Sequence, residues 1–297
     1  MLAGATDESG YGEAVHRGLL RARDELRVEV DYRGGVPAEP EAIMQALREL
    51  ARGDAPLIIV AGAGTSEAAQ RVAWEFPDTR FAVIDGSLLR PNLAVYEVEQ
   101  AESAWLGGAA AALLTKTGTV AHVGGDRDPT ALKARAAFAA GAQAANPKVR
   151  VLTGFAGSEP TVAQRLASRA IDDGADIIFS TATGPAASAV IDAGRARGVR
   201  MIGAGDDWVA RNADVFVASA VADPGVAVFA AARDLRDNVF VGDIVRRFGL
   251  RRPDAVRLSL RAGVPAAVRE RLDEYRAQVA SGGIKIPAGY TGPELGA

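Results

Sequence analysis

The chain has 297 residues, a hydrophobic fraction of 48%, a charged fraction of 24% and a formal net charge of −3. These values are typical of a globular protein with one large or two ordinary domains, and they give no basic field for DNA or RNA. The absence of cysteine excludes disulfides, thiolate zinc sites and cysteine nucleophiles. No apolar run reaches the roughly 18 residues that a membrane span requires.

Short apolar runs bounded by turn residues alternate along the chain with longer segments of helical periodicity. In chain order, the predicted strands cover residues 2–6, 28–32, 56–61, 81–84, 93–99, 119–123, 149–153, 176–181, 200–203, 215–221 and 256–260. The predicted helices cover residues 11–27, 39–51, 66–74, 105–115, 130–145, 161–172, 186–197, 223–238 and 265–280. Gly107 and Gly108 indicate that one helix packs closely against a neighbour. This alternation predicts an α/β protein with doubly wound parallel sheets.

The order of elements repeats at an offset of roughly 120 residues. Residues 56–69 (PLIIVAGAGTSEAA) correspond to residues 176–189 (DIIFSTATGPAASA) in strand, glycine-bearing loop and helix. Two further correspondences keep the same order: residues 81–86 with residues 201–206, and residues 2–7 with residues 120–126. The repeat predicts two similar α/β lobes in tandem.

We expect an N-terminal lobe of residues 1–102, completed by a returning segment at about 223–262, and a C-terminal lobe of residues 103–222. Residues 263–297 are predicted to form a terminal helix and a tail across the hinge side. Ligands bind at the carboxyl ends of strands in open α/β sheets. Two lobes whose carboxyl edges face each other would therefore leave a ligand cleft between them.

Asp85 is the first candidate for a residue in that cleft. It ends the apolar run of residues 81–84 and is followed by Gly86, so it stands where a buried parallel strand stops. The alternative is an aspartate that only starts a turn.

Polar and aromatic residues stand at the ends of the other predicted strands, and together with Asp85 they form the candidate ligand-binding set. The first lobe contributes Asp7, Ser9, Tyr11, Gly62, Thr65 and Asp85, and the second contributes Asp126, Phe155, Ser180, Thr183, Asp206, Asp207 and Trp208. The set has carboxylates, hydroxyls and rings but no obvious cation, which favours a neutral, hydroxylated and flat ligand. Carboxylates accept hydrogen bonds from hydroxyls, and ring faces stack on planar groups.

Catalytic motifs are weak in this chain. His16 and His122 are the two histidines, and their contexts favour surface or packing roles over a triad. Residues 62–64 could open a dinucleotide fingerprint with Asp85 as the following acid, but Glu67 occupies the place of the third glycine. Asp206 and Asp207 could suggest a metal or acid–base pair, yet adjacent side chains rarely converge. We therefore predict no enzyme activity, no cofactor and no metal.

A series of motifs resembles the basic membrane protein family of substrate-binding lipoproteins, of the purine nucleoside receptor type. The motifs that carry the resemblance are residues 7–9 (DES), 76–85 (FPDTRFAVID), 102–110 (ESAWLGGAA), 116–120 (KTGTV), 123–125 (VGG), 138–142 (FAAGA), 146–147 (NP), 157–158 (GS), 174–179 (GADIIF), 201–203 (MIG) and 283–287 (GIKIP). They cover nearly the whole chain. The resemblance implies a type I periplasmic binding protein fold and a nucleoside held by stacked aromatics and carboxylates, with Asp7 and Asp85 where two of those carboxylates are expected.

The chain departs from the family pattern at three places. The family's Ser-Phe-Asn reads Ser9-Gly10-Tyr11, its Ile-Gly-Val-Asp reads Ile202-Gly203-Ala204-Gly205, and its Ser-x-x-Lys reads SAVA at residues 219–222. The base-reading Asn and the Lys are therefore absent, and the acid moves to Asp206 or Asp207.

The resemblance predicts a solute-binding protein that closes two lobes on a small neutral ligand for ABC-type uptake. A nucleoside is the ligand that we expect first. The alternatives are a ligand-sensing regulatory domain of the same fold and, less favoured, an NAD-type oxidoreductase. The expected partners are a small molecule and an ABC permease, without nucleic acid. The first residues lack the regions of a signal peptide. We therefore expect an extracytoplasmic, membrane-anchored lipoprotein if a signal was removed, and a cytoplasmic protein otherwise.

Overall fold

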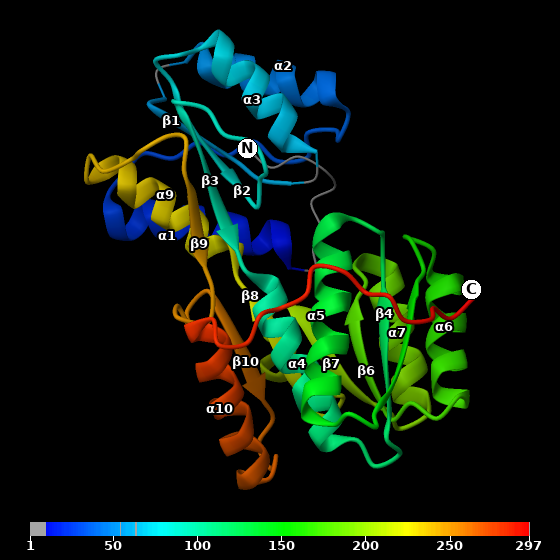
Figure 1. Ribbon diagram of the computed structural model, residues 1–297. Coiled ribbons are helices and arrows are strands. Elements are labelled where there is room, and N and C mark those ends of the chain that lie inside the picture. Colours follow the sequence, from blue (N-terminus) through cyan, green and yellow to red (C-terminus); the bar gives the residue numbers. More distant parts are fainter. Residues whose placement is uncertain (1–9, 54, 63, 297) are drawn as a thin grey trace. The chain divides into compact units, whose positions relative to one another are not determined.

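The backbone passes back and forth between two structural units. The computed structural model describes residues 10–53, 55–62 and 64–296 (Figure 1). Unit 1 comprises Met1–Val98 and Asp223–Phe248, and unit 2 comprises Glu99–Ala222 and Gly249–Ala297. The predicted strand at residues 2–6, Asp7 and Ser9 lie outside the described residues.

Unit 1 contains a parallel sheet with helices on both faces. The strands pair in the order β1-β2-β3-β9, and their bounds are β1 Leu57–Val60, β2 Arg80–Ile84, β3 Leu93–Val98 and β9 Val245–Phe248. The helices are α1 Tyr11–Leu26, α2 Pro40–Ala51, α3 Thr65–Glu75 and α9 Pro224–Arg236. Helices α2 and α3 cover one face of the sheet, and α1 and α9 pack together on the other.

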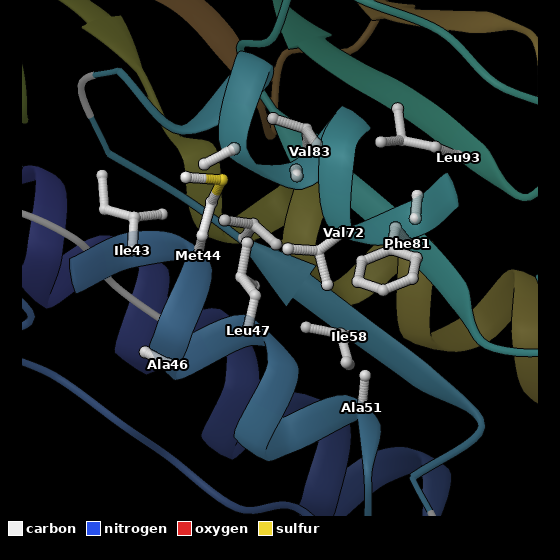
Figure 2. Close-up of a cluster of buried hydrophobic side chains, with 14 of the residues drawn as sticks. Ile43, Met44, Ala46, Leu47, Ala51, Ile58, Val72, Phe81, Val83 and Leu93 are labelled. Atoms are coloured by element: carbon white, nitrogen blue, oxygen red, sulfur yellow. The ribbon is translucent and has the colours of Figure 1, made fainter. Parts of the chain in front are cut away.

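The core of unit 1 lies between α2, α3 and the sheet. Ile43, Met44 and Leu47 of α2 belong to the same buried cluster as Phe81 of β2 and Val72 of α3 (Figure 2). All five are at most 4% exposed. Burying such side chains stabilises a fold by about 1.5–3 kcal/mol each, so this apolar layer holds β2 and its last residue in place.

Unit 2 contains a larger, mostly parallel sheet in the order β10-β8-β7-β6-β4-β5, with β10 antiparallel to β8. The strands are β4 Thr119–Gly124, β5 Arg150–Phe155, β6 Ile177–Thr181, β7 Arg200–Gly205, β8 Phe216–Ala222 and β10 Val256–Leu260. The helices are α4 Gln100–Leu114, α5 Pro129–Ala145, α6 Pro160–Asp172, α7 Gly184–Ala196, α8 Trp208–Arg211 and α10 Ala266–Ser281. Together, the parallel sheets and crossover helices of both units confirm the predicted α/β class.

The crossovers of unit 2 leave its sheet on opposite faces. Helices α6 and α7 share one apolar cluster with alternate residues of β4, β6 and β7. Helix α5 packs on the other face, where Phe138 stacks on Phe179 of β6 with ring centroids 4.9 Å apart. The chain therefore goes to one face after β4 and to the other after the adjacent strand β6. Such a switch point opens a crevice at the carboxyl ends of the two strands.

Helices α4 and α5 cross with almost no side chain between them. An added Cβ would lie 1.9 Å from the carbonyl oxygen of Phe138 at Gly108, and 1.9 Å from that of Trp105 at Gly141. Only glycine fits at these two points. The predicted close packing is thus found at Gly108, whereas a Cβ at Gly107 would lie at ordinary van der Waals distances.

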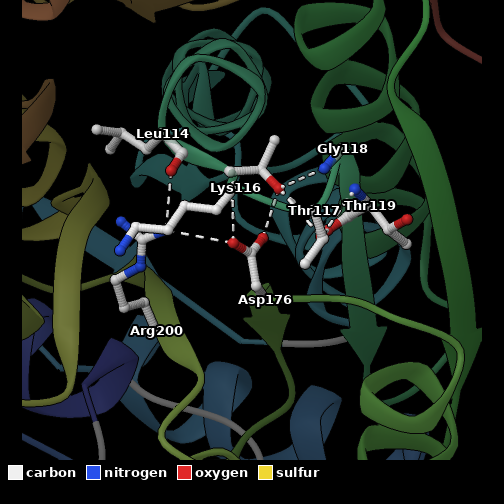
Figure 3. A network of polar contacts seen from close by, with 8 residues as sticks. Leu114, Lys116, Thr117, Gly118, Thr119, Asp176 and Arg200 are labelled. Carbon is white, nitrogen blue, oxygen red and sulfur yellow. Dashed lines mark hydrogen bonds and ion pairs between the residues drawn. The ribbon is translucent and has the colours of Figure 1, made fainter.

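A polar network centred on Asp176 lies at the amino edge of the unit 2 sheet. Its carboxylate accepts hydrogen bonds from the Thr115 hydroxyl and, at 2.7 Å, from the Lys116 backbone N–H. Arg200 donates to the carbonyl oxygen of Leu114 at 2.8 Å and pairs with Asp176 at 3.5 Å (Figure 3). The network ties the starts of β6 and β7 to the turn after α4.

Four sequence expectations differ from the structure. Residues 28–32 form no strand, since they are largely exposed and pair with no described strand. Strand β9 and helix α8 were not predicted, because β9 reads Val-Arg-Arg-Phe and α8 has only four residues. The returning segment to unit 1 ends at Phe248 rather than near residue 262, because β10 pairs with β8.

Across the described ranges, no helix combines the length and the apolar character needed to cross a membrane.

The α4–α5 crossing gives a test of packing. We expect Gly108→Ala to lower the free energy of unfolding of unit 2 by about 1–3 kcal/mol, because the new methyl group overlaps the Phe138 carbonyl. Gly107→Ala is the matched control: its Cβ would meet Ile202 at 3.6 Å and Ala220 at 3.7 Å, and alanine favours a helix by about 1 kcal/mol over glycine. Urea unfolding measures both, and equal midpoints for the two variants would contradict the overlap.

Candidate functional site

Asp85 is held at the carboxyl edge of unit 1 by the backbone of β3. Its N–H donates to the carbonyl oxygen of Tyr96 at 3.0 Å, and its Oδ1 accepts from the N–H of Val98 at 2.8 Å. The residue has φ 55°, a left-handed conformation that aspartate tolerates better than most side chains. Asp85 is exposed and directly follows the buried residues Phe81–Ile84 of β2. The carboxylate is therefore both oriented and accessible.

Tyr11 begins α1 and faces Asp85. Its hydroxyl lies 3.5 Å from Asp85 Oδ2, the outer limit of a hydrogen bond, and the residue is 37% exposed. Desolvation and the charge of Asp85 raise the pKa of the Tyr11 hydroxyl well above its ordinary value. Tyr11 is thus a neutral donor beside a carboxylate.

In the loop after β1, the Thr65 hydroxyl forms a hydrogen bond within the loop itself. Thr65 is 2% exposed and donates from Oγ1 to the carbonyl oxygen of Gly62 at 2.9 Å. What this loop presents at the edge is therefore backbone near Gly62 rather than the Thr65 side chain. The loop after β2 joins it, since Ser66 Oγ accepts from the N–H of Ser87 at 3.1 Å.

In unit 2 the loops after β4 and β6 meet at the switch point. A Cβ at Gly125 would lie 3.4 Å from the Ala182 Cα, so the two loops touch through backbone. Asp126 and Thr183 are exposed on either side of this contact. Ser180 is only 8% exposed, and its hydroxyl accepts from the N–H of Ala182 at 3.4 Å. Asp126 and Thr183 are thus better placed than Ser180 for a ligand.

Asp206 and Asp207 point to different partners, as expected of neighbours. Asp206 forms an ion pair with Arg211. Asp207 accepts from Ser259 Oγ at 2.7 Å and from Arg257 at 3.0 Å, both on the edge strand β10. Although burial raises it, these hydrogen bonds hold the pKa of Asp207 below its ordinary value. Both carboxylates therefore already have partners within unit 2.

Trp208 is also used for packing. Its indole N–H donates to the carbonyl oxygen of Ala204 at 3.0 Å, and its ring stacks on Phe216 with centroids 5.2 Å apart. The ring fills the space over Gly203, where a Cβ would lie 2.1 Å from the indole. We leave Trp208 out of the ligand set that we propose below.

Two arginines lie over the ring of Phe155, and neither contact was expected from the sequence. The guanidinium carbons of Arg127 and Arg135 lie 4.8 and 5.0 Å from the centre of its ring. With Arg211 and Arg257, these arginines correct the expectation of an edge without cations. Arg127 directly follows Asp126, which was the only sequence signal for its position.

His122 lies buried inside β4. Its Nε2 lies 2.9 Å from Thr181 Oγ1 and its Nδ1 lies 3.3 Å from Thr153 Oγ1. Burial, reinforced by the charge of Arg135, lowers the pKa of His122 to about 3. The neutral ring is a packing histidine, as predicted, and it orients Thr181, a strand-end hydroxyl that sequence reasoning missed.

Taken together, the two edges offer exposed carboxylates, hydroxyls and backbone, and they suit binding better than bond breaking. In the part of the chain that the structure describes, no group of three or more His, Asp or Glu side chains could hold a metal ion.

Comparisons with known proteins agree with this architecture. The family model described as "ABC transporter substrate-binding protein PnrA-like" matches residues 1–288. The "CD4+ T-cell-stimulating antigen" of Listeria monocytogenes is 25% identical over 96% of this chain and 85% of its own length. "Basic membrane protein A" of Borreliella burgdorferi is 25% identical over 84% of this chain and 76% of its own length.

A solved structure shows the same fold. An ABC transporter system solute-binding protein from Conexibacter woesei superimposes with a TM-score of 0.78 at 25% identity, and the match covers 97% of each chain.

The buried histidine predicts a pH dependence of stability. The folded pKa of about 3 lies below the unfolded value of 6.5, so the unfolded state binds an extra proton between these values. The free energy of unfolding should therefore fall as pH drops from 6.5, by up to about 1.4 kcal/mol per pH unit from this group. We expect His122→Gln to flatten this slope in urea titrations between pH 7 and 4. Phe138→Leu, a core change that keeps the histidine, should retain the slope; a His122→Gln slope equal to wild type would refute the assignment.

Proposed function

Because the chain belongs to the PnrA-like family of ABC transporter substrate-binding proteins, we propose that it is a non-enzymatic receptor for a nucleoside or a related ribosyl compound. The resemblance read from the sequence is confirmed at the level of the family, and the family's role in solute binding sets the class of function. The nucleoside is our own inference. It rests on the residues at the two carboxyl edges.

The observation that carries the proposal is the state of Asp85. The Val98 N–H holds Oδ1 at 2.8 Å, which fixes the plane of the carboxylate, and the side chain remains exposed. A carboxylate that is held in one orientation and can accept hydrogen bonds from two hydroxyls is suited to a vicinal diol such as ribose. Hydrogen bonds to a charged group contribute about 1.5–3 kcal/mol each. Tyr11 adds a neutral phenol beside it.

Unit 2 would contribute the exposed residues of its switch point. Asp126 and Thr183 flank the contact between Gly125 and Ala182 and supply an acceptor and a hydroxyl. The close backbone approach at Gly125 brings the loops after β4 and β6 together, so that Asp126 and Thr183 could contact the same ligand. The proposed ligand set is therefore Tyr11, Gly62, Asp85, Asp126 and Thr183, with Asp7 and Ser9 retained from the sequence.

Binding by both units would couple the ligand to their relative arrangement. A ligand that makes contacts in one arrangement and not in another shifts the equilibrium by its difference in affinity. The favoured form would be recognised by an ABC permease, and the protein would act outside the cytoplasm, as a lipid-anchored receptor. Membership of the family favours this transport role over a sensor without transport.

Calorimetry with a panel of nucleosides, free bases and monosaccharides tests the ligand class. We expect heat from at least one nucleoside and a weaker response from its free base, because the base lacks the ribose hydroxyls that Asp85 would accept. Mass spectrometry of ligand retained through purification is an independent readout. A panel in which only monosaccharides bind would replace the nucleoside with a sugar, and no binding at all would remove both.

A substitution at Asp85 tests the proposed contact directly. We expect Asp85→Asn to weaken nucleoside binding by about 1.5 kcal/mol or more, since the amide loses the charge and one acceptor. Asparagine keeps the left-handed backbone and can still accept from the Val98 N–H, so the fold should be preserved. Calorimetry with the nucleoside found above measures the change.

Asp243 provides a matched control for this change. It is also an exposed aspartate of unit 1 with positive φ, 60°, but it lies at the turn before β9 rather than after β2. Asp243→Asn should leave the affinity unchanged. Equal affinities of the wild type and Asp85→Asn would exclude Asp85 from the site.

A further inference from the structure

The C-terminal tail of unit 2 inserts a carboxylate between two arginines. Glu294 accepts hydrogen bonds from Arg127, one of them at 3.3 Å, and from Arg135. The hydrogen bond from Arg127 contributes most to holding the pKa of Glu294 below its ordinary value, so this carboxylate is ionised at neutral pH. The tail is seated by a backbone hydrogen bond of 2.7 Å from Leu295 to the carbonyl oxygen of Thr153 on β5.

Arg135 is unusual because it is a buried cation. Its side chain is 8% exposed, against 56% for Arg127 and 30% for Glu294. It lies against the rings of Phe155 and Tyr290, each 5.0 Å from its guanidinium carbon. Among the described residues, nothing accepts a hydrogen bond from its buried Nε. A buried guanidinium needs anionic oxygens, and Glu294 supplies one to a terminal nitrogen of Arg135 but none to Nε.

The location of this pair connects it with the ligand edge. Arg127 follows Asp126 at the end of β4, and Phe155 is the last residue of β5. Both arginines therefore lie at the same carboxyl edge of the unit 2 sheet as Asp126 and Thr183. Planar guanidinium groups match the geometry of carboxylates and phosphates, which bind them through paired hydrogen bonds.

We propose that Arg127 and Arg135 form an oxyanion site at the carboxyl edge of unit 2, and that Glu294 fills this site as an internal carboxylate ligand. The three side chains carry a net charge of +1, which would be +2 without Glu294. A phosphorylated or carboxylated solute must therefore displace Glu294 to reach the two arginines, which lowers its affinity for them. This consequence for selectivity rests on the proposed function, whereas the oxyanion site itself does not.

Glu294→Gln tests the site, with inorganic phosphate as the probe. The variant keeps the size of the side chain and removes its charge. We expect phosphate, titrated by calorimetry at constant ionic strength, to bind Glu294→Gln at least about tenfold more tightly than wild type, which is the usual contribution of one charged hydrogen bond. Phosphate affinities that are equal in the two proteins would overturn the proposal.

Two further variants separate a specific site from a general effect of charge. Glu75→Gln removes one charge from an ion pair with Arg48 in unit 1 and should bind phosphate no better than wild type. The double variant Glu294→Gln with Arg127→Gln should lose the added affinity, because one of the two arginines is missing. A double variant that binds phosphate as tightly as Glu294→Gln would also overturn the proposal.

Should Glu294→Gln not fold, hydrogen exchange on the wild type decides instead. Phosphate that competes with Glu294 should speed exchange of the Leu295 N–H relative to chloride at the same ionic strength, and an unchanged rate would overturn the proposal. None of these measurements involves a nucleoside. If no nucleoside binds the wild type, the proposed function fails and the oxyanion site is still decided. If nucleosides bind, the ratio of affinities for a nucleoside and its 5′-monophosphate should shift toward the monophosphate in Glu294→Gln.

Discussion

Parallel pairing of the strands decides where this protein can present polar groups. Each parallel strand must be followed by a crossover, so all loops that leave the carboxyl ends gather at one edge of a sheet. At the opposite edge of the unit 2 sheet, Asp176 and Arg200 pair with each other and form hydrogen bonds with the backbone of Lys116 and Leu114. At the carboxyl edge the chain leaves toward opposite faces of the sheet, to α5 after β4 and to α7 after β6. The accessible carboxylate Asp126 stands at that switch point.

Carboxylates at the two edges fall into two groups according to their surroundings. Asp206, Asp207 and Glu294 face arginines, and their charges are balanced within unit 2. Asp85 and Asp126 are exposed, and the Asp85 carboxylate is oriented by a backbone N–H. An arginine that pairs with a carboxylate occupies an oxygen that a ligand hydroxyl would need. The exposed pair is therefore better suited to a neutral ligand than the three carboxylates that face arginines.

Much of the fold could be predicted because burial leaves a local signal. The apolar runs of β2 and β6 and the close packing at Gly108 of α4 could be interpreted correctly from single stretches of sequence. The errors have equally local causes: Val28 and Val30 alternate with Glu29 and Asp31 as a strand would, but an isolated segment without a paired neighbour forms no sheet.

The candidate site could be predicted only in part. The positions of its residues follow from the nearby sequence, whereas their contacts come from distant parts of the chain. Strand ends placed Asp85 and Asp126 correctly at carboxyl edges. The partners of Asp207 and Arg127 lie far along the chain, in β10 and in the tail, and no periodicity reports them. Sequence reasoning could therefore name the carboxylates but could not say which of them face arginines.

The α4–α5 crossing has a consequence for how such a protein can diversify. Gly108 and Gly141 bring two backbones into direct contact, so the spacing of these helices cannot be adjusted by changing the volume of a side chain. The opposite face is filled by the side chains of α6 and α7, which can be exchanged for others of similar volume. Relatives that acquire new ligands should therefore keep the α4–α5 face almost unchanged and accumulate their substitutions in the loops that lead to α6 and α7.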